Sequence, residues 1–404
     1  VRVNGRMLVA SISVAAASLG VSLRDPVVSE LSRLGYGRVR GVTRLNSGGS
    51  ERGLRTSHGR YDTDEGPVFC KTSPLTCAAE AFEAEAASLR ALRSATLGSG
   101  LVRMPKPIAT GAMPLGGGFL ALEWLDLTPL GTSFPSTLHA VGEAIADLHT
   151  APQPPGASDA PWAARSPSFG FGRQTYLGAY PQPNGWERSF SDFFVLRRLL
   201  PQLEAACAIG GGGRNGGGVQ WDGGGRAAAV DRSAPARSSP SGIGPLGGGA
   251  DASAVIELRQ MRDRVLSAAE ARLDRLARPP ALLHGELWLG AFGALSGGGG
   301  PALFDPACWY GLPECDLALL EVRGRLGPQF YEAYHAAWPK IDGYDERLNL
   351  FTLYYQLAEL NRLASAGAPQ GEARGAVLPG WSADANLALA VVVESMRRVV
   401  GQGS

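Results

Sequence analysis

Four ionisable side chains stand beside short apolar runs, at intervals that suit a shared chemical task. Lys71 ends the run that starts at Val68, and Glu85 follows fourteen residues later. Far along the chain, Glu286 and Asp305 also follow apolar runs. Lys71 stands out because the chain has only three lysines against 35 arginines. A coding bias towards arginine is the plain explanation of that ratio, but a compact ammonium fits phosphate sites that a guanidinium fork does not.

Phosphoryl transfer needs these side-chain types in this order. A lysine contacts the phosphates, a carboxylate orients the lysine, a base meets the acceptor hydroxyl, and oxygen ligands hold Mg²⁺. A glycine turn at Gly48 and Gly49 precedes the lysine segment. Each feature alone also fits a hairpin turn, a surface lysine, an ordinary ion pair or a turn aspartate. Only the order of all of them favours a kinase.

The elements that position these residues change in type along the chain. Periodicity predicts strands before residue 122 and mainly helices after residue 138. In the helix expected over residues 78–93, Glu85 lies in the middle of an apolar face, so its carboxylate needs a buried partner. His284 is interpreted as a buried histidine that holds its loop rather than reacting. Together these patterns predict an α+β fold with Lys71 and Glu85 close together.

Composition excludes several classes of protein. The formal net charge is +1, which gives no reason to expect nucleic acid or an anionic membrane as a partner. Five cysteines without a CxxC spacing argue against a disulfide framework or a zinc site and favour a reducing compartment. Oligomeric state does not follow from the sequence.

The first 24 residues contain arginines and no acidic residue, and they are rich in Ala, Ser and Val. This composition is typical of a transit segment and predicts a chloroplast or mitochondrial location, with the cytoplasm as the alternative. A secretory signal peptide and an ordinary frayed terminus stay open. The apolar run of residues 8–21 is short for a membrane span.

The chain divides into two expected lobes. Residues 25–122 would form an N-terminal ATP-binding lobe, and residues 123–404 a C-terminal catalytic and substrate lobe. Within the second lobe, residues 210–252 contain several glycine runs and a Ser/Pro cluster. Such a segment cannot bury a core, so we interpret it as a disordered insertion.

Longer motifs resemble those of the fructosamine (ketosamine) kinase family, in a form similar to its plant protein-ribulosamine 3-kinases. The resemblance extends over roughly residues 25–363, without the glycine-rich segment. The matching segments are residues 61–71 (YDTDEGPVFCK), 82–89 (FEAEAASL), 169–171 (FGF), 181–184 (PQPN) with Trp186 and residues 193–194, 282–291 (LLHGELWLGA), 304–311 (FDPACWYG) and 330–334 (FYEAY).

The resemblance implies a protein-kinase-like, two-lobed fold: a small antiparallel sheet lobe and a larger helical lobe. It also implies phosphorylation, with ATP and Mg²⁺, of the 3-hydroxyl of a ketosamine such as a ribulosamine or fructosamine, a deglycation and protein-repair reaction. The implied roles are catalysis by Glu286, ATP binding by Gly48, Gly49, Lys71 and Glu85, adenine contact by the backbone of Glu123, Trp124 and Leu125, sugar binding by Trp288, and magnesium binding by Asp305.

Three positions depart from the family pattern. The family's catalytic loop reads His-Gly-Asp-Leu-Trp, any residue, Gly-Asn, whereas this chain has Glu286 for the aspartate and Ala291 for the asparagine. The extra methylene of Glu286 moves the carboxylate by about 1 Å, and a shift of that size can cost about 100-fold in rate. Ala291 offers no side-chain oxygen to a metal. Ser50 stands where the family commonly has a cysteine.

The departures leave alternative functions open. One is a ketosamine kinase with weakened activity. Another is a pseudokinase that binds nucleotide and acts as a scaffold or sensor. A third is a kinase for a different small alcohol, such as an aminoglycoside or choline, against which the block of residues 169–194 argues by resemblance alone.

Overall fold

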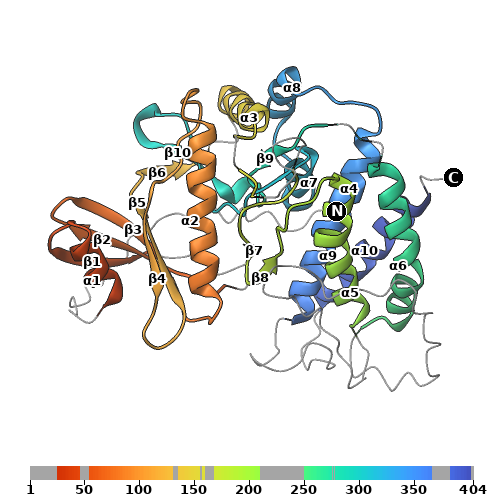
Figure 1. The fold of residues 1–404 in the computed structure, drawn as a ribbon, viewed down its shortest axis with the longest axis horizontal. Coiled ribbons are helices and arrows are strands. Elements are labelled where there is room, and N and C mark those ends of the chain that lie inside the picture. Colours follow the sequence, from red (N-terminus) through yellow and green to blue (C-terminus); the bar gives the residue numbers. More distant parts are fainter. Residues whose placement is uncertain are drawn as a thin grey trace.

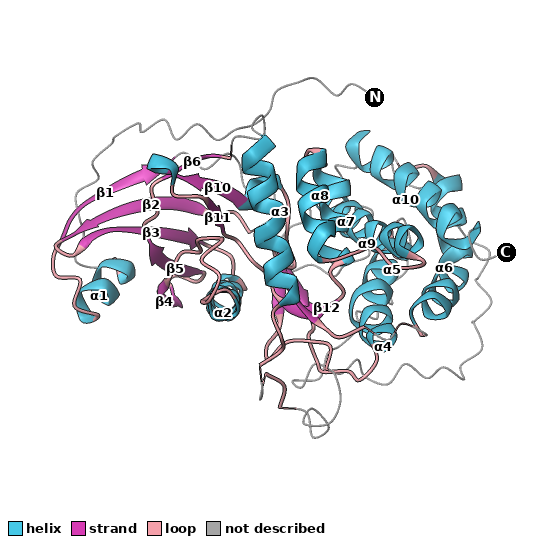
Figure 2. Ribbon diagram, turned by 90° about the horizontal axis from the view of Figure 1, so that it is seen from above, coloured by secondary structure: helices cyan, strands magenta, loops and turns pink. Residues whose placement is uncertain are grey.

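The computed structural model describes residues 25–45, 54–130, 135–154, 157–159, 168–209, 250–274, 276, 278–365 and 383–401. A five-stranded sheet lies at one end of the molecule and a group of helices at the other, as Figures 1 and 2 show. The predicted Gly48 and Gly49 turn, the transit segment and nearly all of the glycine-rich segment lie outside the described residues.

The N-terminal sheet is antiparallel throughout, with the strand order β1-β2-β3-β5-β4. Its strands are β1 (Val39–Leu45), β2 (Ser57–Thr63), β3 (Gly66–Ser73), β4 (Pro107–Ala112) and β5 (Gly118–Glu123). Two helices accompany it, α1 (Pro26–Arg33) and α2 (Ala78–Ala95). Asp25 caps α1 by accepting a hydrogen bond from the Val27 amide at 2.8 Å, as its position before Pro26 predicts.

Alternation along the strands gives the sheet two different faces. Val68 and Cys70 on β3 are buried in a cluster with α1. Phe69 points to the other face and packs with the cluster that includes α2. Lys71 is two residues beyond Phe69, so its side chain must also lie on the α2 face, where Glu85 is found.

The larger part of the chain is helical, with short strands at the boundary with the sheet (Figure 2). Its helices are α3 (Pro135–Thr150), α4 (Phe190–Phe194), α5 (Leu200–Cys207), α6 (Ala252–Leu273), α7 (Glu314–Arg323), α8 (Pro328–Ala337), α9 (Tyr344–Ser365) and α10 (Ala383–Gly401). Its strands are β6 (Leu127–Pro129), β7 (Thr175–Leu177), β8 (Tyr180–Gln182), β9 (Ala281–Leu283), β10 (Phe292–Leu295), β11 (Pro301–Leu303) and β12 (Trp309–Gly311).

The predicted α+β order, a sheet followed by helices, is confirmed. Helix α6 begins at Ala252, because the Asp251 carboxylate accepts hydrogen bonds from the Ser253 and Ala254 amides and caps the helix. The lobe boundary after residue 122 stays a prediction. Among the described residues, no helix has the length and apolar character needed to cross a membrane.

Candidate active site

The Lys71 ammonium lies between two carboxylates from different parts of the fold. Its Nζ is 2.7 Å from Glu85 Oε1 on α2 and also forms an ion pair with Asp305, on the loop after β11. The Lys71 side chain is only 7 % exposed. The predicted approach of Lys71 and Glu85 is therefore confirmed, and the sheet lysine is joined to the distant loop that carries Asp305.

Burial and charge oppose each other in this cluster. Burial by itself lowers the pKa of Lys71, but the charges of Asp305 and Glu85 outweigh it and raise that pKa above its ordinary value. Burial raises the pKa of Glu85 to about 7; the charges of Asp305 and Glu286 add to the rise, while Lys71 opposes it. One ammonium thus pairs with two carboxylates, and Glu286 is a third carboxylate whose charge acts on Glu85.

The loop that carries Glu286 is held by a buried aspartate on α7. Asp316 accepts hydrogen bonds from the backbone amides of His284, at 2.7 Å, and Gly285, at 2.8 Å. The His149 ring, 3.1 Å from the same carboxylate, is fixed in turn by Tyr334 at 2.8 Å. These contacts fix the backbone of the loop to α7.

His284 joins the two loops, as expected of a histidine that holds its loop. Its Nε2 donates to the Phe304 carbonyl at 3.1 Å, and its Nδ1 accepts from the Glu286 amide at 3.3 Å. Between them, Gly285 has a φ of +77°, and a Cβ there would lie 2.0 Å from the Ala307 carbonyl oxygen. Only glycine fits this crossing of the two loops.

Asp305 is held in a left-handed backbone conformation, with a φ of +62°. Non-glycine residues seldom adopt this conformation, which is more common at functional sites than elsewhere. The same loop is fixed to α2, since the Cys308 amide donates to Ser88 Oγ at 3.1 Å. Ser88 lies on α2 close to Glu85, so one helix positions both partners of Lys71.

Glu286 and Trp288 line the same pocket, on the side of the loop that faces α9. The β7–β8 hairpin, α5, α7 and α9 supply the rest of its wall. The lining residues beyond the loop are Leu177, Gly178, Tyr180, Gln202, Leu319, Arg323, Tyr355, Ala358, Glu359 and Arg362. The pocket places the predicted base and the predicted sugar-binding tryptophan around one space.

The donor set for a metal is small. Ala291 is fully buried at the end of the short 3-10 turn before β10 and supplies only backbone groups: its carbonyl accepts from the Phe304 amide at 3.0 Å. Over the described ranges, no group of three or more His, Cys, Asp and Glu side chains forms a metal cage. Asp305, whose side chain is 32 % exposed beside the buried ammonium, is the carboxylate that would hold a metal. Such a site suits Mg²⁺ that takes other ligands from phosphates and water.

The segment predicted to meet adenine follows β5. The Glu123 amide donates to the Lys106 carbonyl at 2.9 Å, and its carboxylate pairs with Arg103. The Trp124 ring lies 4.8 Å below the Arg60 guanidinium. The Glu123 amide and carboxylate thus hold the segment, and adenine contact by the backbone of Glu123, Trp124 and Leu125 stays a prediction.

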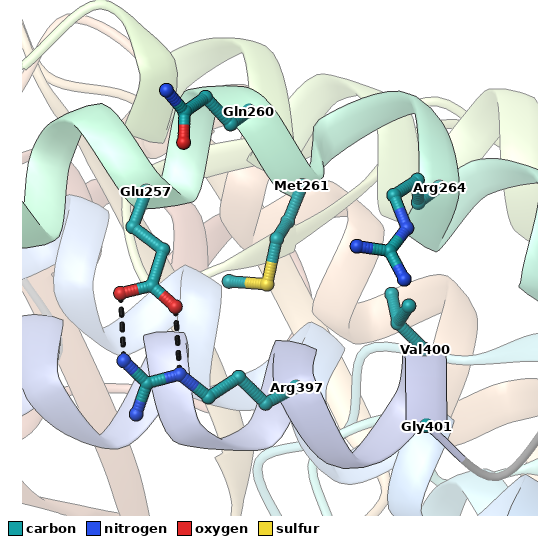
Figure 3. A pocket seen from close by; sticks show the side chains of 7 residues that line it. All are labelled: Glu257, Gln260, Met261, Arg264, Arg397, Val400 and Gly401. Carbon is teal, nitrogen blue, oxygen red and sulfur yellow. Dashed lines mark hydrogen bonds and ion pairs between the residues drawn. The ribbon is translucent and has the colours of Figure 1, made fainter.

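A second hollow lies at the end of the molecule away from the sheet, between α6 and α10 (Figure 3). Arg397 spans it through two parallel hydrogen bonds to Glu257, of 2.6 and 2.7 Å. No residue of the Lys71 cluster or of the Glu286 loop lines it.

The family model described as fructosamine kinase matches residues 42–217 and 252–372, which is most of the chain. The chain belongs to the fructosamine kinase family. It is similar to mouse ketosamine-3-kinase, with 31 % identity over 81 % of this chain and 93 % of that protein. It is also similar to the chloroplastic protein-ribulosamine 3-kinase of Arabidopsis thaliana, with 28 % identity over 81 % of this chain and 80 % of that protein.

Solved structures show the fold of this fructosamine kinase family member. A protein assigned as a fructosamine-3-kinase from Haemophilus somnus has a TM-score of 0.62 and 20 % identity, over 92 % of this chain and 96 % of that one. The aminoglycoside phosphotransferase APH(4)-Ia, in a ternary complex with AMP-PNP and hygromycin B, has a TM-score of 0.51 and 13 % identity, over 94 % and 98 %. The predicted kinase-like fold is thereby confirmed.

Sequence reasoning missed the residues that hold the loops and those that shape the pocket. Asp316 had a usable signal, because it stands inside the apolar run from Cys315 to Leu320. Arg323 and Glu359 had none, since their segments give no reason to expect them beside Trp288. The roles of Lys71 and the other site residues toward nucleotide and sugar stay predictions.

Proposed function

We propose that the chain is an ATP-dependent kinase that phosphorylates the 3-hydroxyl of free or protein-bound ketosamines, a deglycation reaction that frees the amine. The observation that carries the proposal is the buried cluster of Lys71, Glu85 and Asp305. It is joined through His284 to the loop that places Glu286 and Trp288 on one pocket. The names of the mouse and Arabidopsis relatives support the ketosamine as acceptor.

Each residue has a part in this proposal. Lys71 would contact the phosphates of ATP, and Asp305 would hold Mg²⁺, whose charge suits the excess of carboxylates. When bound, Mg–ATP supplies the phosphoryl group and positive charge that stabilises the oxygens in transfer. Trp288 would orient the sugar, and Glu286 would accept the proton of the 3-hydroxyl.

We further propose that turnover is weak. Glu286 is one methylene longer than the family's aspartate, and Ala291 removes a side-chain oxygen from a buried position beside the Asp305 loop. The retained Lys71, Glu85 and Asp305 favour nucleotide binding at ordinary strength. The same two substitutions favour the second candidate function, a nucleotide-binding pseudokinase that acts as a scaffold or sensor.

One assay separates the two candidates. The purified chain is incubated with ATP, Mg²⁺ and a ribulosamine, and the phosphorylated sugar is measured by mass spectrometry beside a nucleotide titration. A ketosamine kinase forms product that is lost in Lys71→Met, and it forms none from hygromycin B. Nucleotide binding without product would identify a pseudokinase, and the absence of both would reject both.

For location, we propose import into a plastid or mitochondrion, on the composition of residues 1–24 and the chloroplastic name of the Arabidopsis relative. A fluorescent reporter carrying residues 1–24 should collect in that organelle. A diffuse cytosolic signal would contradict the proposal, and secretion would indicate a signal peptide.

A further inference from the structure

The wall of the Glu286 pocket carries a group of three charged side chains from two helices. Arg323 is the last residue of α7, whereas Glu359 and Arg362 lie one turn apart on α9. Arg323 Nη2 is 2.9 Å from Glu359 Oε2, and Arg362 donates to both oxygens of the same carboxylate, at 3.0 and 2.6 Å. We call these three residues the arginine wall.

The arginine wall has a net positive charge. Burial alone would raise the pKa of Glu359, but the hydrogen bonds and charges of Arg362 and Arg323 outweigh it and lower that pKa. Its carboxylate therefore stays ionised and holds both guanidinium groups. Two guanidinium charges against one carboxylate leave one positive charge on the wall. Arg323 gives one N–H to Glu359, and its guanidinium has further donors in a fork that matches a carboxylate.

The wall is close to the surface proposed to bind sugar. The Arg323 guanidinium carbon lies 5.9 Å from the centre of the Trp288 ring, and the side chains of the arginine wall are between a quarter and a third exposed. A sugar on Trp288 with its hydroxyl at Glu286 would have its substituent in the pocket that Arg323 also lines. The lining of the pocket thus includes the Glu286 carboxylate and the positive charge of the arginine wall.

This arrangement selects among ketosamines. An amine that carries an α-carboxylate places a negative charge one carbon beyond the nitrogen, within a short reach of the sugar. In a ketosamine formed on a lysine side chain, the nitrogen is followed by four methylenes, which carry no charge. Resting on the proposed kinase function, we propose that the preferred acceptors are ketosamines of free α-amino acids, whose carboxylate is bound by Arg323, with Glu359 and Arg362 as positioning residues.

The test uses two ligands that differ in one charge, N-ribulosylglycine and N-ribulosylglycinamide, titrated calorimetrically into the full chain. We expect the carboxylate to bind about 10-fold or more tightly than the amide, as a charge-assisted fork should give. In Arg323→Gln the ratio should fall to about 1, and in Arg323→Lys, which keeps the charge without the fork, it should be intermediate. Arg325→Gln is the matched control, because Arg325 lies 65 % exposed and pairs with Glu321 away from the pocket.

The outcomes separate this inference from the proposed function. For the natural chain, the inference would be overturned by equal affinities for the two ligands or by no binding of either. It would also be overturned if the ratio of the two affinities persisted in Arg323→Gln or was unchanged in Arg323→Lys. Preferred binding of the carboxylate without phosphorylation would leave carboxylate binding by Arg323 standing and reject the kinase. Phosphorylation of both ligands with equal kcat/KM would keep the kinase and reject the preference.

Discussion

At the scale of residues, the Lys71 cluster shows how one buried ammonium is kept charged. Lys71 is buried on the α2 face of the sheet, where an isolated charge would be costly. Glu85 and Asp305 compensate it. Burial, followed by the charges of Asp305 and Glu286, raises the pKa of Glu85, while Lys71 opposes the rise. The two carboxylates outnumber the single ammonium, which favours the binding of a further cation.

Restoring the family's catalytic residues should raise turnover. Glu286→Asp would return the carboxylate to its shorter reach, and Ala291→Asn would add a metal ligand. The two residues lie in one loop region, so we expect the double variant to exceed either single variant, by about tenfold or more over the natural chain. Phosphorylation of a ribulosamine measures this for all four proteins.

Nucleotide titration and thermal unfolding of the four proteins are the controls. Nucleotide affinity should change little, because Lys71, Glu85 and Asp305 are intact. Ala291 is fully buried, so an unfolding temperature far below that of the natural chain would show that asparagine does not fit. A natural chain that is already as fast as the double variant would contradict the prediction.

His58 should make stability depend on pH. It pairs across the sheet with Lys71, and burial, followed by the Lys71 charge, lowers its pKa from 6.5 to about 4. Between those values the unfolded chain binds a proton that the folded chain does not, so folding stability falls as the pH drops through this window. Between pH 7.5 and pH 5.0, the unfolding free energy of the natural chain should fall by about 2 kcal/mol more than that of His58→Gln.

Urea unfolding at the two pH values measures that difference. His139→Gln is the control, because His139 is 55 % exposed on α3 and far from the lysine in sequence. It should follow the natural chain. A His58→Gln profile parallel to that of the natural chain would show that His58 does not resist protonation.

At the scale of elements, α2 and α7 position the site from two sides. α2 carries Glu85 toward Lys71 and Ser88 toward the Cys308 amide. α7 carries Asp316, which binds the amides of the Glu286 loop. The strands on either side of that loop are only three or four residues long, so their backbone hydrogen bonds are few. The side-chain contacts to backbone groups therefore hold the loop instead.

Loss of the Asp316 charge should destabilise the fold and slow any catalysis. An Asp316→Asn side chain would turn an amide donor toward amide donors and leave one buried N–H without its acceptor. We expect a loss of about 3 to 5 kcal/mol in unfolding free energy, the range seen when one member of a buried charged contact is removed. Asp345→Asn is the matched control: Asp345 is 82 % exposed in the first turn of α9, and its loss should cost about 0.5 kcal/mol or less.

Chemical denaturation of both variants gives these numbers, and turnover of the Asp316→Asn variant reports the loop. Equal unfolding free energies for the two variants would show that the buried hydrogen bonds contribute little. An Asp316→Asn variant with unchanged turnover would show that the loop keeps its arrangement without the carboxylate.

At the scale of the whole molecule, the sheet and the helices meet through polar contacts around the site. Lys71 pairs with Asp305, the Arg103 amide donates to the Pro301 carbonyl at 2.9 Å, and Arg173 pairs with Glu83 at 2.8 Å. The apolar cluster around α2 also includes residues of α3 and of the Glu286 loop. Residues from distant parts of the sequence thus form one site because the two lobes share this boundary.

The glycine-rich segment should be dispensable for stability. Its flanking elements are already joined, since Arg259 on α6 donates to the carbonyls of Cys207 and Ile209 at 2.8 Å. Replacing residues 214–246 with a short Gly/Ser linker should shift Tm by less than about 2 °C, because each doubling of loop length costs only about 0.6 kcal/mol. Calorimetry tests this. A broad or much lower transition would show that the segment contributes to the core.

Sequence alone determined the family, the order of the lobes and the Lys71–Glu85 pair. These follow from local information: motif letters, alternation that puts Lys71 opposite Cys70, and a helical period that puts Glu85 on an apolar face. Tertiary structure decided which loops meet. Asp316 under the catalytic loop and Arg323 beside Trp288 depend on how separate segments pack, and residue spacing within one segment carries no information about that packing.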